Sequence, residues 1–301
     1  MVISIRPEKL EITLSLVAKL IEGQFPEFAS MPIQPVRIQG HDNRTFRLGD
    51  KMLIRLPSMA PYALKVLKEQ EWLPKLQLQL SITIPKPLAL GQPSADYPWH
   101  WSIYAWREGE SANALTFADH ELGQIAADLA LFLKELHKIE ASNELIPGLH
   151  NYWRGDHVGV YDEQARSQIA KLQGVIDSQA ALALWAKAVS SKWYQPPVWV
   201  HGDLASGNIL IKDGKLAAVI DFGGMGVGDP ACDLVIAWTF LKSKSREIFK
   251  EHMALDEETW TRARGWALWK ATFELCNLTD KTTPEANKHK HIIEEVLNEQ
   301  S

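Results

Sequence analysis

Three oxygen-bearing side chains stand around one predicted β-hairpin in the middle of the chain. Asp203 lies just before the short apolar strand 208–211, Asn208 opens that strand, and Asp221 directly follows a second apolar strand, 216–220. An Asp-Gly pair between the strands is typical of a tight hairpin turn. Because a hairpin brings its two ends together, we expect Asp203, Asn208 and Asp221 to converge. Carboxylate and amide oxygens are suitable ligands for a hard cation such as Mg²⁺.

The spacing of these residues indicates phosphoryl transfer. HGDLASGN followed by DFG has the H-x-D-x-x-x-x-N and D-F-G pattern of the protein-kinase catalytic set, although Gly202 stands where protein kinases carry Arg. In that scheme Asp203 takes or orients the proton of the attacking hydroxyl, and Asn208 and Asp221 hold Mg²⁺ on the nucleotide phosphates. Any one of them alone would more often be a turn residue. His201 is expected to support the loop rather than to transfer a proton.

Three segments, HGDLASGNIL, VIDFGGMGVGDPACDL and RGWALWKA, resemble the aminoglycoside phosphotransferase family. The resemblance implies an α+β, two-lobed, protein-kinase-like fold, which that family shares with choline kinases and macrolide phosphotransferases. The small β-rich N-lobe would span residues 1–105 and the mostly helical C-lobe residues 106–301. Within GDPACDL, Asp229 and Asp233 are interpreted as helix-start and loop-bracing residues rather than metal ligands.

The resemblance also implies ATP or GTP as the phosphoryl donor, Mg²⁺ as the metal, and a small molecule with a free hydroxyl as the acceptor. An aminoglycoside-like acceptor is the first expectation. Another metabolite, such as an amino alcohol, a sugar or a macrolide, stays open. So does a nucleotide-binding protein without turnover. A protein kinase is disfavoured, because no Ala-Pro-Glu follows the DFG motif.

The N-terminal part offers candidates for holding the nucleotide phosphates. Residues 36–48 read as strand, turn and strand, and the turn contains Gly40 and Asn43. In kinases the corresponding hairpin aims backbone N–H groups at the phosphates. This turn has one Gly instead of the kinase G-x-G-x-x-G, so an ordinary hairpin is the alternative.

The next strand, 51–57, carries Arg55 where most kinases have a phosphate-binding Lys. Arg can hold phosphates, with a different reach and geometry from Lys; a solvated surface charge is the alternative. A helix is predicted over 62–80, kinked or ended at Pro74. Glu69 on this helix is the predicted partner of Arg55, with Glu71 as runner-up.

A strand followed by a Gly-containing turn, within residues 97–110, is expected to lead into the hinge between the lobes. By the kinase resemblance the backbone of Tyr104, Ala105 and Trp106 would hydrogen-bond the adenine. The Trp106 ring could stack on the base, but packing inside the protein is favoured.

Apolar residues at helical spacing predict helices over the following ranges: 7–23, 119–138, 161–194, 231–242, 244–254 and 256–278. His137 is read as a helix C-terminal residue rather than a catalyst. By resemblance, Asp256, Trp269 and Glu274 are acceptor-contact candidates. A helix cap and packed side chains are the favoured interpretation of these three.

Composition and net charge limit the kinds of binding partner that the sequence allows. A net charge of −5 over 301 residues disfavours a nucleic-acid partner and is compatible with a cationic small substrate. Cys232 and Cys276 lie in apolar, helix-like contexts, which predicts free thiols. No apolar run approaches the length of a membrane span, and the N-terminus lacks a signal core. We therefore expect a cytoplasmic enzyme with no membrane partner.

Overall fold

The computed structural model describes residues 9–37, 39–40, 42–141 and 145–299. The chain divides into two compact units, which are considered separately below. The first comprises Met1–Gly109 with Ala218–Gly223, and the second comprises Glu110–Ala217 with Gly224–Ser301. In the part of the chain that the structure describes, no helix is long and apolar enough to cross a bilayer.

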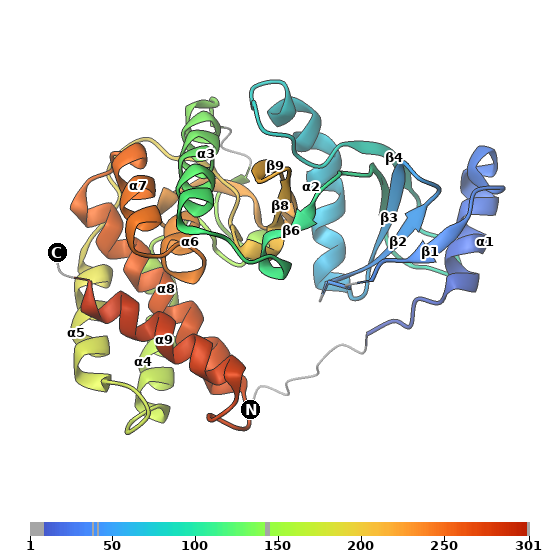
Figure 1. The fold of residues 1–301 in the computed structure, drawn as a ribbon. Coiled ribbons are helices and arrows are strands. Elements are labelled where there is room, and N and C mark those ends of the chain that lie inside the picture. The colour runs from blue at the N-terminus through green and yellow to red at the C-terminus, as the bar shows by residue number, and fades with distance from the viewer. Residues whose placement is uncertain (1–8, 38, 41, 142–144, 300–301) are drawn as a thin grey trace. The chain divides into compact units, whose positions relative to one another are not determined.

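The first unit is an antiparallel sheet with the order β1-β2-β3-β5-β4 (Figure 1). Helices α1 (Leu14–Gln24) and α2 (Ala60–Gln77) accompany it. The strands are β1 (Ile33–Pro35), β2 (Asn43–Leu48), β3 (Met52–Pro57), β4 (Pro87–Gly91) and β5 (Trp101–Ala105).

Alternation along the strands gives the sheet two different faces. One face is apolar: Phe46, Ile54 and Ile103 pack with Val17 and Ile21 of α1 in a buried core. The other face lies under α2 and is polar. Arg55, the predicted phosphate ligand, lies on this face and contacts Glu69 of α2.

Three of the boundaries predicted in this unit were wrong. Helix α1 begins at Leu14, because the Thr13 hydroxyl caps it by accepting from the Leu16 amide; the predicted start at Pro7 lies outside the described residues. The first strand of the 36–48 hairpin ends at Pro35, before the predicted range. Helix α2 spans Ala60–Gln77 rather than 62–80, so Pro74 does not end it. Its neighbours Leu73 and Leu76 are buried, so packing holds the last turn despite the missing N–H.

The second unit is mostly helical, and helix α8 (Glu257–Asn277) lies at its centre, in contact with α4, α5 and α9. The other helices are α3 (Asp119–Lys138), α4 (Asp162–Lys171), α5 (Ser178–Ser190), α6 (Ile236–Thr239), α7 (Ser243–Met253) and α9 (Pro284–Asn298). The predicted 119–138 helix is confirmed to the residue. The predicted 161–194 helix is two helices, and 231–242 is a short 3₁₀ segment (Pro230–Val235) followed by α6.

Two small sheets carry the central motif. Strand β7 (Val198–Val200) pairs with β10 (Gly226–Gly228), and β8 (Ile209–Lys212) lies between β6 (Glu110–Ser111) and β9 (Lys215–Val219). The β8–β9 turn is confirmed: Asp213 and Gly214 have φ of 53° and 72°. Positive φ at both central residues is the requirement of the tight turn that an Asp-Gly pair favours.

Candidate active site

The loop that carries Asp203 leaves strand β7 and is fixed by one buried carboxylate. Asp233 accepts hydrogen bonds from the backbone amides of His201 and Gly202, each at 2.7 Å. Burial raises the pKa of Asp233, and His201 and these two amides work against that rise. The buried His201 ring accepts from the Asp203 amide through Nδ1 at 3.2 Å. His201 therefore supports the loop, and Asp233 braces it, as predicted.

Gly202 explains why this loop departs from the protein-kinase pattern. Its φ is +81°, a conformation that side chains rarely adopt, and a Cβ atom there would lie 2.0 Å from the carbonyl oxygen of Gly224. An Arg at this position would require the loop to move. Close backbone packing, rather than a charged side chain, sets the course of the chain into Asp203.

Asp203 itself is half exposed and pairs with a lysine from helix α8. Lys270 Nζ lies 2.7 Å from Asp203 Oδ1. Burial would raise the pKa of Asp203, but Lys270, together with His201 and Arg154, outweighs burial and lowers that pKa to about 2. Asp203 is therefore an ionised carboxylate at neutral pH, poised to accept a hydrogen bond and a weak base for full proton removal.

Asn208 is tied to the same loop. It lies in a 3₁₀ turn, Ser206–Asn208, directly before β8, and not in the strand as predicted. Its amide nitrogen donates to the Asp203 carbonyl oxygen at 2.9 Å. With the nitrogen so used, the Asn208 side chain presents its oxygen as the remaining ligand, which fits a hard cation.

A narrow cavity of about 10 Å³ opens beside Asp203. Arg154, Trp266, Trp269 and Lys270 contribute to its wall. The Arg154 guanidinium carbon lies 5.2 Å from the ring centre of Trp266 and 4.8 Å from that of Trp269. The cavity next to the candidate catalytic carboxylate is therefore aromatic and positively charged.

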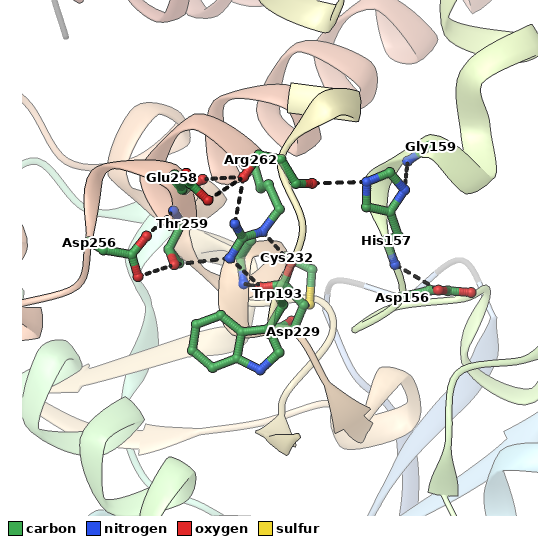
Figure 2. Close-up of polar contacts among 12 residues, drawn as sticks. Asp156, His157, Gly159, Trp193, Asp229, Cys232, Asp256, Glu258, Thr259 and Arg262 are labelled. Atoms are coloured by element: carbon green, nitrogen blue, oxygen red, sulfur yellow. Dashed lines mark hydrogen bonds and ion pairs between the residues drawn. The ribbon is translucent and has the colours of Figure 1, made fainter. Parts of the chain in front are cut away.

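Helix α8 makes a second ion pair, which is buried (Figure 2). Arg262 of α8 donates to Asp229 at 2.6 Å and to the hydroxyls of Ser191 and Thr259 at 2.8 and 3.0 Å. Asp256 accepts from the amide and the hydroxyl of Thr259, each at 2.8 Å, as the N-cap of α8. Asp229 and Asp256 are thus structural, as the sequence favoured.

The first unit assembles the predicted phosphate-side residues. Arg55 of β3 donates to Asp221 at 2.7 Å and lies 3.5 Å from Glu69 of α2. The predicted Arg55–Glu69 pair is therefore present. The runner-up, Glu71, pairs instead with Lys75 on the exposed side of α2. Burial would lower the pKa of Arg55, but Asp221 and Glu69 raise it overall, so its positive charge is fixed.

Asp221 has a left-handed backbone, with φ of 64°. Such residues are uncommon and are often found at functional sites. The turn that follows is anchored to α2, because Lys68 donates to the Gly223 carbonyl oxygen at 3.0 Å. Asp221 belongs to the first unit, whereas Asp203 and Asn208 belong to the second. The convergence of the three side chains stays a prediction.

The predicted hinge residues are more constrained than expected. The Ala105 and Trp106 amides already donate to the carbonyl oxygens of Lys86 and Lys51, at 2.9 and 2.7 Å. The Tyr104 hydroxyl donates to Glu69 at 2.6 Å, so this side chain orients the partner of Arg55. The Arg47 guanidinium stacks over Trp106 at 3.7 Å from the ring centre, which agrees with the packing role. Donation to adenine by the two amides is therefore excluded in this conformation, and their carbonyl groups remain as candidates.

The turn that contains Gly40 and Asn43 is held in place by contacts of Asp42. Asp42 pairs with Lys65 of α2 at 2.6 Å, and its carbonyl oxygen accepts from the Ser58 amide at 2.9 Å. Among the described residues, a Cβ at Gly40 would meet only the Asn43 carbonyl oxygen, at 3.9 Å.

Among the other expectations, Trp269 is packed: it stacks on Tyr161 at 4.1 Å between ring centres and donates to Gln164 at 2.7 Å. His137 is buried, which lowers its pKa to about 4, so it is a neutral residue at the end of α3. Both cysteines are free thiols, as predicted.

Sequence reasoning missed three side chains at these sites: Lys65 and Lys68 of α2, and Lys270. Each acts on a segment distant in sequence; Lys270, for example, meets Asp203 across 67 positions. No local pattern signals such a contact. The one available signal for Lys270 was its place in RGWALWKA, which resembles the family; Arg154 lies in residues 151–156, which by resemblance lie near the acceptor cleft.

Solved structures with the same fold are phosphotransferases. An aminoglycoside phosphotransferase determined with GDP and kanamycin matches 93% of this chain and 97% of its own, at 18% identity and a TM-score of 0.69. A type I macrolide 2′-phosphotransferase matches 93% of this chain and 97% of its own, at 16% identity and a TM-score of 0.63. The two-lobed, kinase-like α+β fold expected from the sequence is therefore confirmed.

The family is settled by the sequence itself. The model of the phosphotransferase enzyme family matches residues 33–266, more than half of the chain, and the chain belongs to that family. An aminoglycoside 3′-phosphotransferase of Escherichia coli is 41% identical over 46 residues, which is 15% of this chain and 17% of that protein. So short a match does not carry that protein's substrate over to this chain.

Proposed function

We propose that this protein transfers the γ-phosphoryl group of ATP or GTP to a hydroxyl group of a small molecule. The observation that carries the proposal is the fixed loop of Asp203. Asp233 holds the loop by two backbone amides at 2.7 Å, and the Asp203 carboxylate emerges from it 47% exposed beside a cavity. Rigid support and an accessible carboxylate are what positioning of a hydroxyl requires.

In this proposal Asp203 orients the attacking hydroxyl by accepting its hydrogen bond. Phosphoryl transfer passes through a loose transition state in most analyses, so positioning and charge stabilisation matter more than early proton removal. A carboxylate with a pKa near 2 fits the orienting role better than that of a strong base.

Asn208 and Asp221 are the proposed metal ligands, because each offers an oxygen and Mg²⁺ prefers oxygen. When bound, Mg²⁺ would neutralise charge on the nucleotide phosphates. Arg55, held by Glu69, would contact the phosphates from β3. Gly40 and Asn43 would offer backbone N–H groups to them. The carbonyls near Tyr104, Ala105 and Trp106 would face the base.

The acceptor panel starts with aminoglycosides, since several neighbours were solved with such compounds, kanamycin and gentamicin among them. Amino alcohols, sugars and macrolides complete it. The test is consumption of ATP and of GTP with each acceptor, followed by mass detection of the phosphorylated product. Binding of Mg-nucleotide together with turnover of one acceptor is the expected result. Failure of every class would remove the proposal.

A nucleotide-binding protein without turnover is the second candidate. It is favoured by the 2.7 Å contact between Arg55 and Asp221, which engages the carboxylate proposed for the metal. Calorimetric titration with ATP, with and without Mg²⁺, separates the two candidates. An enzyme requires Mg²⁺ for tight binding and for turnover. The second candidate binds nucleotide and consumes none.

A further inference from the structure

We propose that the cavity beside Asp203 is an oxyanion subsite, which takes a carboxylate or phosphate group of the acceptor. The inference rests on the proposed function, because it concerns the same acceptor. It narrows the acceptor to a hydroxyl compound that carries an anionic group close to the reacting hydroxyl.

Two buried donors without acceptors point to this ligand. Arg154 Nη1 and Trp266 Nε1 are both buried, and neither finds a hydrogen-bond partner among the residues that the structure describes. Both residues line the cavity. A buried donor without a partner costs free energy, so such groups in native proteins usually meet an oxygen from water or a ligand.

The charges of the side chains around the cavity also favour an anionic ligand. Arg154 and Lys270 line it with two positive charges, and Asp203 supplies one negative charge. Asp233 directs its two carboxylate oxygens at the amides of His201 and Gly202. Asp229, further back, is paired with Arg262. The residues that line the cavity thus carry one net positive charge, and the Asp233 carboxylate, held by the loop amides, does not line it.

The size of the cavity suits an oxygen atom rather than a ring. Its free volume of about 10 Å³ is at the lower limit for holding one water molecule. One oxygen of a carboxylate or phosphate fits there, with the rest of the acceptor outside. An ammonium group in the cavity would lie beside the two cations Arg154 and Lys270, and the one carboxylate among the lining side chains, Asp203, is already paired with Lys270.

The transferred γ-phosphoryl group is a second possible source of oxyanion chemistry at this place. The two sources differ in what the loss of Arg154 weakens. A subsite for the acceptor affects binding of small anions and leaves Mg-ATP affinity unchanged. If Arg154 instead contacts the transferred phosphoryl group, its loss weakens Mg-ATP binding and leaves binding of small anions unchanged.

The experiment compares three two-carbon hydroxyl compounds that differ in charge: glycolate, ethylene glycol and ethanolamine. Their small size removes any requirement for a particular acceptor shape. Binding is followed by ligand-observed NMR titration at constant ionic strength, for the wild-type protein and for Arg154→Gln, Arg154→Lys and Trp266→Phe. Arg166→Gln is the matched control, because Arg166 is a half-exposed arginine that pairs with Asp162 on the surface.

We expect the wild-type protein to bind glycolate about tenfold more tightly than ethanolamine, with ethylene glycol in between. Arg154→Gln should weaken glycolate binding about tenfold, and Arg154→Lys should restore part of it. Trp266→Phe, which keeps a ring and loses the donor, should have a smaller effect. Arg166→Gln should match the wild type.

Three results would overturn the proposal. They are absent glycolate binding by the wild type, equal or tighter binding of ethanolamine, and an Arg154→Gln variant that weakens Mg-ATP while leaving glycolate untouched. Mg-ATP titration of the wild type tests the proposed function separately. A protein that binds glycolate through Arg154 but no nucleotide would keep the subsite and lose the phosphotransferase assignment.

Discussion

Helix α8 makes two ion pairs with the segment that contains Asp203 and Asp229. The two pairs have similar distances but differ in burial. Arg262 meets Asp229 at 2.6 Å, with side chains only 1% and 4% exposed. Lys270 meets Asp203 at 2.7 Å, with side chains 32% and 47% exposed. Near-equal distances therefore coexist with very different access to water.

Access to water decides what each pair can do. A buried pair becomes strongly destabilising when one partner is removed, because the other charge stays buried. A half-exposed pair contributes little to stability, since water screens it. Arg262 and Asp229 thus hold the loop in place, while Lys270 and Asp203 remain free to exchange partners with a substrate.

The largest effect is expected at the buried pair. Arg262→Met should lower the free energy of unfolding by about 3–5 kcal/mol, since Asp229 would be left as an uncompensated buried charge. Burial already raises the pKa of Asp229 even with Arg262 beside it. Denaturant unfolding measures the loss, and adding Asp229→Asn should recover part of it. A loss below about 1 kcal/mol would show that the buried pair contributes no more to stability than the half-exposed pair.

Arg55 provides an ion pair of intermediate exposure in the first unit, with Arg55 16% and Asp221 44% exposed. If Arg55 holds the nucleotide phosphates, Arg55→Ala should raise the nucleotide KM and lower kcat. The expected cost is about 2–3 kcal/mol of transition-state stabilisation. Arg55→Lys should restore part of it, because charge returns without the two-pronged geometry.

Glu69→Gln is the matched variant for that experiment, because Glu69 orients Arg55 and has no proposed contact with phosphate. It should give a milder form of the Arg55→Ala defect in steady-state kinetics. Wild-type behaviour of Arg55→Ala would make Arg55 a structural charge. Lys65 of α2 would then be the next cation to test.

Lys68 is a buried cation whose charge is disfavoured, in contrast to Arg262. Burial lowers its pKa to about 7, against about 10.4 in an unfolded chain. Between these two values the unfolded state binds the additional proton. The free energy of unfolding should therefore rise with pH from about 7 to 10.4, with a Lys68 contribution of up to about 1.4 kcal/mol per pH unit.

Lys68→Met should remove that slope and relieve the cost present below pH 7. The difference between wild type and variant isolates Lys68 from other groups that titrate in this range, such as the cysteines. Urea unfolding at several pH values provides the measurement. Parallel pH curves for the two proteins would contradict the assignment.

The smallest effect on stability is expected at the half-exposed pair. Lys270→Met should change the free energy of unfolding by less than about 1 kcal/mol. The pH dependence of kcat/KM should change more in this variant than its stability does. Lys270, together with His201 and Arg154, lowers the pKa of Asp203 to about 2, so loss of Lys270 should raise that pKa. The acid limb of kcat/KM, which reports an ionised Asp203, should then move to higher pH. An unchanged profile would separate Lys270 from Asp203.

Much of this could be predicted from local pattern. The β8–β9 turn followed from an Asp-Gly pair, and α3 followed from apolar spacing. The pair of Arg55 with Glu69 followed from the resemblance. In each case, residues close in sequence, or a family motif, carried the information. Pro74 shows the limit, because tertiary packing of its neighbours outweighed a local helix breaker.

The rest depended on contacts between distant segments. Lys270 pairs with Asp203, and the Tyr104 hydroxyl donates to Glu69, only because the fold brings distant strands and helices together. The backbone of residues 104–106 was expected to hydrogen-bond adenine, but the amides of Ala105 and Trp106 already donate to Lys86 and Lys51. Helix α9 was not anticipated from the sequence. Such effects are properties of packing and have no signature in composition or spacing.

Turnover by the Asp203→Asn variant tests the central claim most directly. The substitution keeps the size of the side chain and removes its charge, so binding of Mg-ATP and the folded structure should match the wild type. With the acceptor that the panel identifies, kcat should fall by about 10²–10⁴-fold, the usual scale for a group that handles the reacting proton. Wild-type turnover by Asp203→Asn would show that another group positions the hydroxyl, and would contradict the account.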